Sequence, residues 1–486
     1  MIHNIQNSNT KKLIIVGGGI GGLFASWKLL QNGYNVTIIE RQKFVGGLST
    51  SIKKNNCCID IGPHYISVDK TSHIYEDMCY LLNQNNIIEL SSIHKSYKSY
   101  FQNNILDSPP RLSNIVKNNK NSLVKSLFKE IIPKRKNFSE NISSDEYLIS
   151  LYGEEIYNSW CKPILIQNYG EIPPVQIIKN SFEPITIKKT LNYLNKTQNL
   201  SQNKITKIDS SDLDCYFKDG MGSIIDSLEK QISDLGGKII LDATIQSIEH
   251  GDPKLVKYLK NDENFNESSD MILYSIPLSN TIQWFEDTPF NLDDDDNHEF
   301  STNGILVFLL VDIPKLFDGW ILDVYDLSIP FFRITQQTFL SSNVAPKNRT
   351  LLCFELRSKK DDEFWFLDKS ELFNLAKSTL SKIFQLTDRN IDELIVLKLK
   401  NLYRPKHHPF KSSDQEIKEF IHTFPNEFAL GTSAFDTGDN PTRLSHDELV
   451  KPDKKKSYGG FYNSLLNSQK IINFILSSEK SEKHKN

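Results

Sequence analysis

The chain has 486 residues, enough for two or three domains on the usual scale of about 150 residues each. A net charge of −3 and a hydrophobic share of 38% are ordinary for a globular protein and give no indication of a nucleic-acid partner. The longest apolar run, residues 305–311, is far too short to cross a bilayer, and the polar first twelve residues do not have the pattern of a signal peptide. We therefore expect a cytoplasmic protein; nothing in the composition indicates its oligomeric state.

The first expected elements form a strand–turn–helix–strand unit. Residues 13–16, LIIV, have the composition of a strand that is buried on both faces. They lead into a glycine turn at 17–22, and residues 23–33 have helical periodicity that ends in a glycine. A second apolar run at 35–40 predicts another strand. The pattern therefore predicts the start of a parallel sheet with a helix on one face.

The glycine turn has the spacing Gly17-x-Gly19-x-x-Gly22, and Glu40 follows Gly22 by eighteen residues. Gly17 permits the tight turn, Gly19 lets the backbone approach a pyrophosphate, and Gly22 lets the helix pack on the strand. The free N–H groups at a helix start attract phosphate, and a carboxylate at Glu40 can accept hydrogen bonds from ribose hydroxyls. Glycine-rich turns also arise for packing alone, but the position between a strand and a helix favours a dinucleotide site.

This turn by itself fits FAD and NAD equally. Gly46 and Gly47 follow the second strand, and a second glycine pair, which lets the backbone pass close to a ligand, is unnecessary for NAD. The pair resembles the Glu-(x)n-Gly-Gly extension of FAD-dependent amine oxidases and their relatives. Asp60-x-Gly62-x-His64 resembles the segment that passes the flavin ring in that superfamily. We therefore expect FAD as the cofactor.

Later segments continue the resemblance in order along most of the chain. Residues 151–177 resemble the helical segment of protoporphyrinogen oxidase-like proteins and UDP-galactopyranose mutases. Residues 216–249 resemble the helix and strand pair that return to the adenine, and 270–285 the strand that recrosses the FAD domain. Residues 330–335 resemble a strand of the substrate domain, and 459–476 the last helix, whose N-terminus abuts the flavin. Their order carries the inference, because each match alone could reflect core packing.

The resemblance implies an α/β fold in which a Rossmann-like FAD-binding domain is interleaved with an α+β substrate domain. The expected FAD-binding domain consists of residues 1–85, 205–290 and 415–478. The expected substrate domain consists of 86–204 and 291–414, and a polar tail at 479–486 is expected to be disordered.

The resemblance also implies which residues hold the cofactor. The backbone of Ile245 would face the adenine, and the helix that begins near Gly460 would direct its N–H groups at the flavin. The full expected set is Gly17, Gly19, Ile20, Gly22, Glu40, Arg41, Gly46, Gly47, Leu48, Gly62, Pro63, His64, Ile245, Gly431, Gly460, Phe461 and Tyr462. No metal ligands are expected.

Three residues are candidates for a catalytic or substrate-binding role. His64 could tune the flavin or shuttle a proton, or it could simply bond to the backbone. Arg333 lies among apolar residues and could bind a substrate carboxylate or phosphate, or form a structural salt bridge, for instance to Glu355. Tyr403 could line the flavin or substrate cavity, or be simple packing.

The leading functional hypothesis is an FAD-dependent oxidoreductase that passes hydride from a small organic substrate to the flavin N5. The alternative is an isomerase like UDP-galactopyranose mutase, but a diphosphate needs cationic clamps. Thr186, Gln336 and Thr432 stand where that family has Arg, Glu and Arg. Gln469 and the Gly431-Thr432 pair also depart from the oxidases. A flavin-holding scaffold without turnover is a third class, for which no motif is present.

The segment 111–136 carries eight Lys or Arg residues and only Glu130 as an acid. Apolar residues recur at helical spacing, at Leu123, Leu127 and Ile131. One interpretation is a surface helix that makes weak peripheral contact with an anionic membrane. The other, which we favour, is an ordinary solvated helix.

Overall fold

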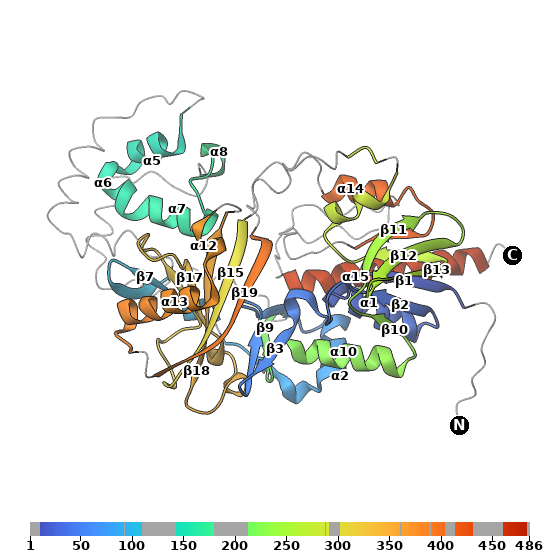
Figure 1. Ribbon diagram of the computed structural model, residues 1–486, viewed down its shortest axis with the longest axis horizontal. Coiled ribbons are helices and arrows are strands. Elements are labelled where there is room, and N and C mark those ends of the chain that lie inside the picture. The colour runs from blue at the N-terminus through green and yellow to red at the C-terminus, as the bar shows by residue number, and fades with distance from the viewer. Residues whose placement is uncertain are drawn as a thin grey trace.

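Two large β-sheets organise the chain, and each is assembled from segments that are far apart in the sequence (Figure 1). The computed structural model describes residues 10–91, 93–108, 142–178, 212–286, 288–290, 302–359, 362–387, 390–403, 414–430 and 460–483. The expected α/β class, a Rossmann-like domain interleaved with an α+β domain, is confirmed.

The first sheet is five-stranded and fully parallel. Its strands, in spatial order, are β10 (Lys238–Ile240), β2 (Asn35–Ile39), β1 (Lys12–Val16), β14 (Met271–Tyr274) and β20 (Glu427–Ala429). The central strand β1 is buried on both faces, as its apolar run predicts. Leu13 and Ile15 pack with the helices on one face, and Ile14 and Val16 pack with a second, antiparallel sheet on the other.

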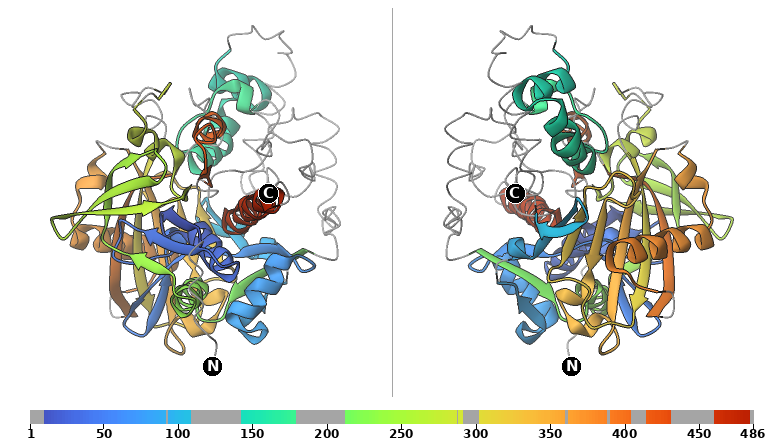
Figure 2. Two further views of the ribbon diagram at one scale, coloured as in Figure 1. Left: turned by 90° about the vertical axis from the view of Figure 1, so that its right-hand side faces the viewer. Right: turned by 90° about the vertical axis from the view of Figure 1, so that its left-hand side faces the viewer.

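Helices cover one face of this sheet, and three antiparallel strands cover the other (Figure 2). The helices are α1 (Ile20–Gln31), α10 (Gly222–Asp234) and α15 (Gly460–Lys483). The covering strands are β11 (Thr244–Glu249), β12 (Lys254–Lys260) and β13 (Glu263–Ser269). In Figure 1, α15 runs from the chain end toward the other large sheet.

Helix α15 corrects one expectation about the chain end. The polar tail was expected to be disordered from residue 479, yet the helix continues to Lys483. Glu and Lys are good helix formers, and extending an existing helix is far easier than starting one. A polar composition therefore does not end a helix whose preceding turns are packed. Residues 484–486 lie outside the described part of the chain.

The second sheet is seven-stranded and antiparallel except where β16 pairs with β7. Its order is β19 (Ile391–Tyr403), β15 (Thr302–Val311), β18 (Thr350–Ser358), β17 (Arg333–Gln336), β16 (Ile321–Val324), β7 (Tyr97–Phe101) and β8 (Asn104–Asp107). Helix α13 (Lys369–Phe384) packs on one face through Leu372, Ala376 and Leu380. The opposite face contributes Leu351 and Cys353 to the core shared with the parallel sheet.

Smaller helices and sheets complete the structure around the two large sheets. A helical group with a core of its own consists of α5 (Ser144–Tyr152), α6 (Glu154–Ile156), a π-helical turn (Tyr157–Cys161), α7 (Lys162–Tyr169) and α8 (Val175–Ile178). Two further sheets are β3 (Ser51–Lys54) with β4 (Cys57–Asp60), and β5 (Ile66–Asp69) with β9 (Asp212–Phe217) and β6 (Ile87–Glu89). Further α-helices among the described residues are α2 (His73–Leu82), α12 (Glu363–Phe366) and α14 (Asp414–Ile421).

Within the described residues, no helix combines the length and the apolar character needed to span a bilayer. The basic segment 111–136 lies outside the described residues, so its contact with a membrane stays a prediction. The exact domain boundaries stay predictions as well.

Candidate functional site

The glycine turn joins β1 to α1, and its three glycines meet different surroundings. Gly17 has a φ of +99°, and a Cβ atom there would lie 2.5 Å from Ile276 Cγ2. A Cβ at Gly22 would lie 2.3 Å from the Gly17 carbonyl oxygen, so only glycine fits both places. A Cβ at Gly19 would meet nothing within 4 Å. Gly17 and Gly22 are therefore required by packing, whereas Gly19 borders open space.

Gly19 is also the N-cap of α1, and no side chain caps that helix start. The first N–H groups of a helix have no partner inside the helix and carry the positive end of its dipole. The first turn of α1 contains no acidic side chain, and Ile20 is buried there. An uncapped helix start beside open space is a site that fits a pyrophosphate.

Glu40 lies directly after β2, beside the glycine turn. Its Oε2 accepts the Gly18 N–H at 2.7 Å, and its Oε1 accepts the Gln42 N–H at 2.7 Å. Each carboxylate oxygen has a second lone pair, so both can accept one more hydrogen bond. The neighbouring Arg41 is exposed. Glu40 is thus oriented by the backbone and still able to accept ribose hydroxyls.

The second glycine pair lies against the first turn. The Gly46 N–H donates to the Gly18 carbonyl oxygen at 2.7 Å, and Gly19 and Gly46 form an isolated parallel bridge. Gly46 has a φ of +100° and Gly47 a φ of +56°, which L side chains rarely adopt. Leu48 follows with 37% of its surface exposed. The two glycine segments therefore line one edge of the parallel sheet.

The Asp60–His64 segment is held by the two small sheets, by the start of α10 and by the turn that follows β17. Asp60 is buried and accepts hydrogen bonds from Ser51, from Tyr216 and from the Met221 N–H. Burial raises the pKa of the Asp60 carboxyl, while those hydrogen bonds oppose the rise. The side chain of Gln337 donates to the Asp60 carbonyl oxygen at 2.9 Å. This network fixes the loop that contains Gly62 and Pro63.

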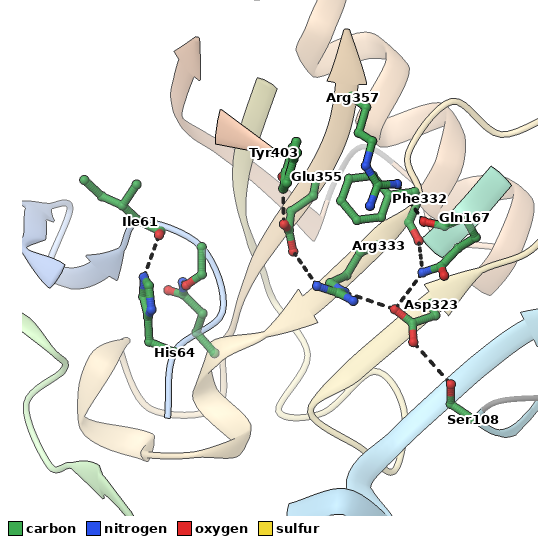
Figure 3. A network of polar contacts seen from close by, with 12 residues as sticks. Ile61, His64, Ser108, Gln167, Asp323, Phe332, Arg333, Glu355, Arg357 and Tyr403 are labelled. Atoms are coloured by element: carbon green, nitrogen blue, oxygen red, sulfur yellow. Dashed lines mark hydrogen bonds and ion pairs between the residues drawn. The ribbon is translucent and has the colours of Figure 1, made fainter. Parts of the chain in front are cut away.

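His64 lies on the same loop, and its Nε2 lies 2.8 Å from the Ile61 carbonyl oxygen (Figure 3). Because a carbonyl oxygen only accepts, the Nε2 atom carries the proton in this bond. This hydrogen bond agrees with the alternative interpretation of His64, in which the side chain simply bonds to the backbone. It leaves Nδ1 of the neutral ring as an acceptor, so a proton-shuttle role for His64 stays a hypothesis.

The remaining expected cofactor residues come from three other places. Ile245 is on β11. Just before this strand, the Ala243 N–H donates to the Glu40 carbonyl oxygen at 3.0 Å, which holds the start of β11 next to Glu40. Phe461 and Tyr462 are buried in the first turn of α15, which begins at Gly460. Helix α15 packs on the glycine turn because Ser468 Oγ donates to the Gly21 carbonyl oxygen at 3.0 Å. Gly431 lies outside the described residues.

A network of charged groups lies on the face of the seven-stranded sheet opposite α13 (Figure 3). Arg333 on β17 is in register with Asp323 on β16 and with Glu355 on β18. Its Nε donates to Asp323 Oδ1 at 3.0 Å, and its Nη1 lies 3.9 Å from Glu355 Oε1. These two carboxylates raise the pKa of Arg333 although burial lowers it. The guanidinium is thus neutralised by the protein itself.

Tyr403 extends the network to the edge strand β19. Its hydroxyl donates to Glu355 Oε2 at 2.8 Å. Burial, together with the adjacent Glu355 carboxylate, raises the pKa of Tyr403 well above its ordinary value. Tyr403 therefore keeps its proton and acts as a hydrogen-bond donor.

Arg357 and Gln167 belong to the site although the sequence did not single them out. The Arg357 Nη1 donates to the Gln167 carbonyl oxygen at 2.6 Å, and the Gln167 side chain donates to Asp323 Oδ1 at 3.0 Å. The signal for Arg357 was present: on a strand, a residue two positions from Glu355 points to the same face. Gln167 and Asp323 meet only through the tertiary fold.

Several buried oxygen atoms have no hydrogen-bond partner among the described residues: Gln167 Oε1 and Thr335 Oγ1 at this face, and Gln337 Oε1 in the turn that follows β17. Buried polar atoms in native proteins are nearly always paired, with water or ligand where the protein offers nothing. Thr335 is two residues from Arg333 on β17, and Gln167 donates to Asp323. These two atoms favour this face as the place where a polar ligand or water is held.

Comparisons with known proteins agree with the fold. Residues 15–80 match the family of NAD(P)-binding Rossmann-like domains. A 4,4'-diapophytoene desaturase from Staphylococcus aureus is 30% identical over 92 residues, and a 4,4'-diaponeurosporene oxygenase from Staphylococcus haemolyticus is 25% identical over 95 residues. Each match spans only 18% of the relative's length.

The similarity to solved structures extends over nearly the whole chain. A reduced UDP-galactopyranose mutase superposes with a TM-score of 0.68 at 16% identity, covering 96% of both chains. A protoporphyrinogen oxidase-like protein from Exiguobacterium sp. 255-15 superposes with a TM-score of 0.63 at 16% identity, covering 96% of this chain and 99% of that one. At this identity the likeness establishes the fold and not the reaction.

Proposed function

We propose that this chain is an FAD-dependent oxidoreductase, of the superfamily of FAD-dependent amine oxidases and related flavoproteins, that acts on a small organic substrate. The Rossmann-like match and the likeness of the fold to solved flavoprotein structures support this proposal. The observation that carries the proposal is the open space at Gly19, beside an uncapped helix start and the Glu40 carboxylate. Bound FAD would supply the chemistry, by accepting hydride from the substrate at the flavin N5.

The residues of this chain would hold the cofactor through its adenosine half. The N–H groups of the first turn of α1 would bind the pyrophosphate, because no side chain competes for them. Glu40, already fixed by Gly18 and Gln42, would accept the ribose hydroxyls. The start of α15 would direct its N–H groups to the far end of the cofactor.

The substrate would lie on the polar face of the seven-stranded sheet. Three observations support this position: the charged network around Arg333, the buried oxygens without partners, and the bond from Gln337 to the loop before His64. His64 has an acceptor nitrogen left over from its bond to Ile61 and could take a proton there.

One observation favours the isomerase alternative, a flavin-dependent enzyme that acts on a sugar nucleotide. Two guanidinium groups, Arg333 and Arg357, occur in one site, as recognition of a diphosphate would require. Arg333, however, is already paired with two carboxylates. Gln336 holds the Leu316 N–H and the Gly319 carbonyl oxygen and is thereby committed to the fold. We therefore place the oxidoreductase first.

An anaerobic reduction experiment separates the two reactions. The FAD-loaded protein would be mixed without oxygen with an amine, a porphyrinogen or a polyene, and the flavin absorbance followed. Bleaching by one of these supports the oxidoreductase. Conversion of a UDP-sugar only after reduction with dithionite, and with no net electron transfer, would replace it by the isomerase.

A further inference from the structure

Arg357 differs from the other guanidinium of the site because, among the residues that the structure describes, no carboxylate forms an ion pair with it. Arg333 has two acidic partners, Asp323 and Glu355, whereas Arg357 forms no ion pair with any of the described residues. A charge withdrawn from water without a partner is unfavourable, and buried charges are normally paired. The positive charge of Arg357 is therefore available to pair with an anionic ligand.

The residues around Arg357 orient the plane of its guanidinium but do not neutralise its charge. Its Cζ lies 3.7 Å from the centroid of the Phe332 ring and 5.1 Å from the centroid of the Tyr403 ring. Its Nη1 donates to the Gln167 carbonyl oxygen at 2.6 Å. Gly170, the C-cap of α7, lies against the side-chain stem, where a Cβ atom would be 3.3 Å from Arg357 Cδ. Aromatic stacking and one carbonyl bond orient the fork but use few of its five N–H groups.

We propose that Arg357 binds an oxyanion of the substrate, a carboxylate or a phosphate, and so determines that the substrate is an anion. This inference rests on the proposed function, because it places the ligand in the substrate site of that enzyme. A planar fork with free N–H groups matches the two oxygens of a carboxylate or phosphate. Burial also lowers the pKa of Arg357 to about 10, so the side chain is still charged at neutral pH. An anion that binds beside it would offset the unfavourable burial of that charge.

The sequence had given this role to Arg333. The two arginines lie on adjacent strands, and both stack near Phe332, with Arg333 Cζ at 5.6 Å from that ring. An anion that approached Arg333 would meet the carboxylate of Asp323, which is hydrogen-bonded to the same guanidinium at 3.0 Å, and that of Glu355, which lies 3.9 Å from it. Arg357 offers the same chemistry, and neither carboxylate forms an ion pair with it.

The proposal is tested by measuring anion binding to the whole protein with titration calorimetry. Benzoate, inorganic phosphate and pyrophosphate would each be titrated in the presence of saturating ADP, which keeps the glycine turn filled. A separate titration of ADP reports on that turn, so a failure of nucleotide binding is seen there and not in the anion data. Benzoate binding identifies a carboxylate site, and phosphate or pyrophosphate binding identifies a phosphate site.

The variants are Arg357→Gln, Arg357→Lys and, as matched control, Arg349→Gln. Arg349 lies directly before β18 of the seven-stranded sheet and is paired with Asp392 at 2.7 Å. We expect Arg357→Gln to bind the preferred anion at least about tenfold more weakly, Arg357→Lys to be intermediate, and Arg349→Gln to match the wild type.

Three results would overturn the proposal. The wild-type protein could bind none of the anions, or a folded Arg357→Gln protein could bind them as tightly as the wild type. If Arg357→Gln does not fold, Arg357→Lys decides, because the fixed fork is lost while the charge remains. Undiminished binding by the lysine variant would then contradict a site built on that fork.

Discussion

Asp323 and Arg333 face one another across strands β16 and β17, with Arg333 Nε donating to Asp323 Oδ1 at 3.0 Å. Glu355 lies on the other side of the same guanidinium. Both carboxylates are largely buried, with 9% and 4% of their side chains exposed. The arginine is therefore first of all the counter-ion of two buried acids.

Replacing Arg333 with Met should destabilise the fold strongly. The substitution leaves Asp323 and Glu355 without their cation, and breaking a buried ion pair from one side costs about 3 kcal/mol or more. Urea unfolding followed by circular dichroism measures the loss, and Arg333→Lys should lose less. Unchanged stability together with lost substrate affinity would return Arg333 to the substrate-binding role that its sequence context indicated.

Tyr403→Phe should remove one hydrogen bond and nothing else. The ring that lies beside Arg357 and Phe332 is kept, but Glu355 loses a donor, so the free energy of unfolding should fall by about 1 kcal/mol. The raised pKa of Tyr403 keeps its proton in place at neutral pH, so the pH profile of flavin reduction should keep its shape. A large fall in the reduction rate at unchanged stability would instead make Tyr403 a proton donor.

Two glycine variants separate cofactor binding from packing. Gly22→Ala puts a methyl group 2.3 Å from the Gly17 carbonyl oxygen and should destabilise the protein by about 1–3 kcal/mol. Gly19→Ala meets no atom within 4 Å, so it should cost less than about 1 kcal/mol while it weakens FAD binding about tenfold or more. Thermal melts and FAD titrations give both quantities. Equal FAD affinity in Gly19→Ala and the wild type would mean that the open space there is not the pyrophosphate site.

Stability should depend on pH through His250. Burial lowers its pKa, but the bonds of its ring to Glu427 at 2.8 Å and to the Trp284 carbonyl oxygen at 2.9 Å raise it overall. A folded-state pKa above the ordinary 6.5 stabilises the fold fully below that pH, and the stabilisation is lost as pH rises through the folded pKa. Urea unfolding at pH 6 and pH 9 should therefore show a smaller decrease in His250→Gln than in the wild type.

His422 provides a control of opposite sign. Burial lowers its pKa to about 4, and its Nε2 accepts the Ala429 N–H at 3.1 Å. Its stabilisation is therefore present above pH 6.5 and is lost as pH falls toward the folded pKa. His422→Gln should make the protein less sensitive to acid.

The result that would contradict the His250 prediction is a loss of stability between pH 6 and pH 9 that is equal in His250→Gln and the wild type. It would show that the His250–Glu427 pair does not determine that loss.

The first strand–helix–strand unit could be predicted because its signals are local. Runs of apolar residues at 13–16 and 35–40 correspond to Lys12–Val16 and Asn35–Ile39, and the glycine turn lies between them as its spacing requires. Glu40 follows β2 for the same reason. Short-range periodicity determines such elements, so each strand end is predicted to within one residue. The helix expected at 23–33 begins three residues earlier, at Ile20, and ends at Gln31.

The charged network could be predicted only in part, because it depends on strand order. Glu355 was a possible partner of Arg333, but the closer partner is Asp323, which reaches it only through the pairing of β16 with β17. Gln167 comes from a helix that is far away in the sequence. No periodicity in the sequence reports which strands become neighbours, so the partners Asp323 and Gln167 could not be predicted, whereas Arg357 could be placed on the face of Glu355 by its spacing along one strand.

Cofactor binding by the purified protein tests the account most directly. The apoprotein would be titrated with FAD and, separately, with NAD, and the bound flavin counted from its absorbance after gel filtration. We expect one FAD per chain, no comparable binding of NAD, and about tenfold weaker binding in Glu40→Ala, which loses the acceptor for the ribose hydroxyls. A folded protein that stays colourless after incubation with excess FAD, or a Glu40→Ala variant with full flavin occupancy, would contradict it.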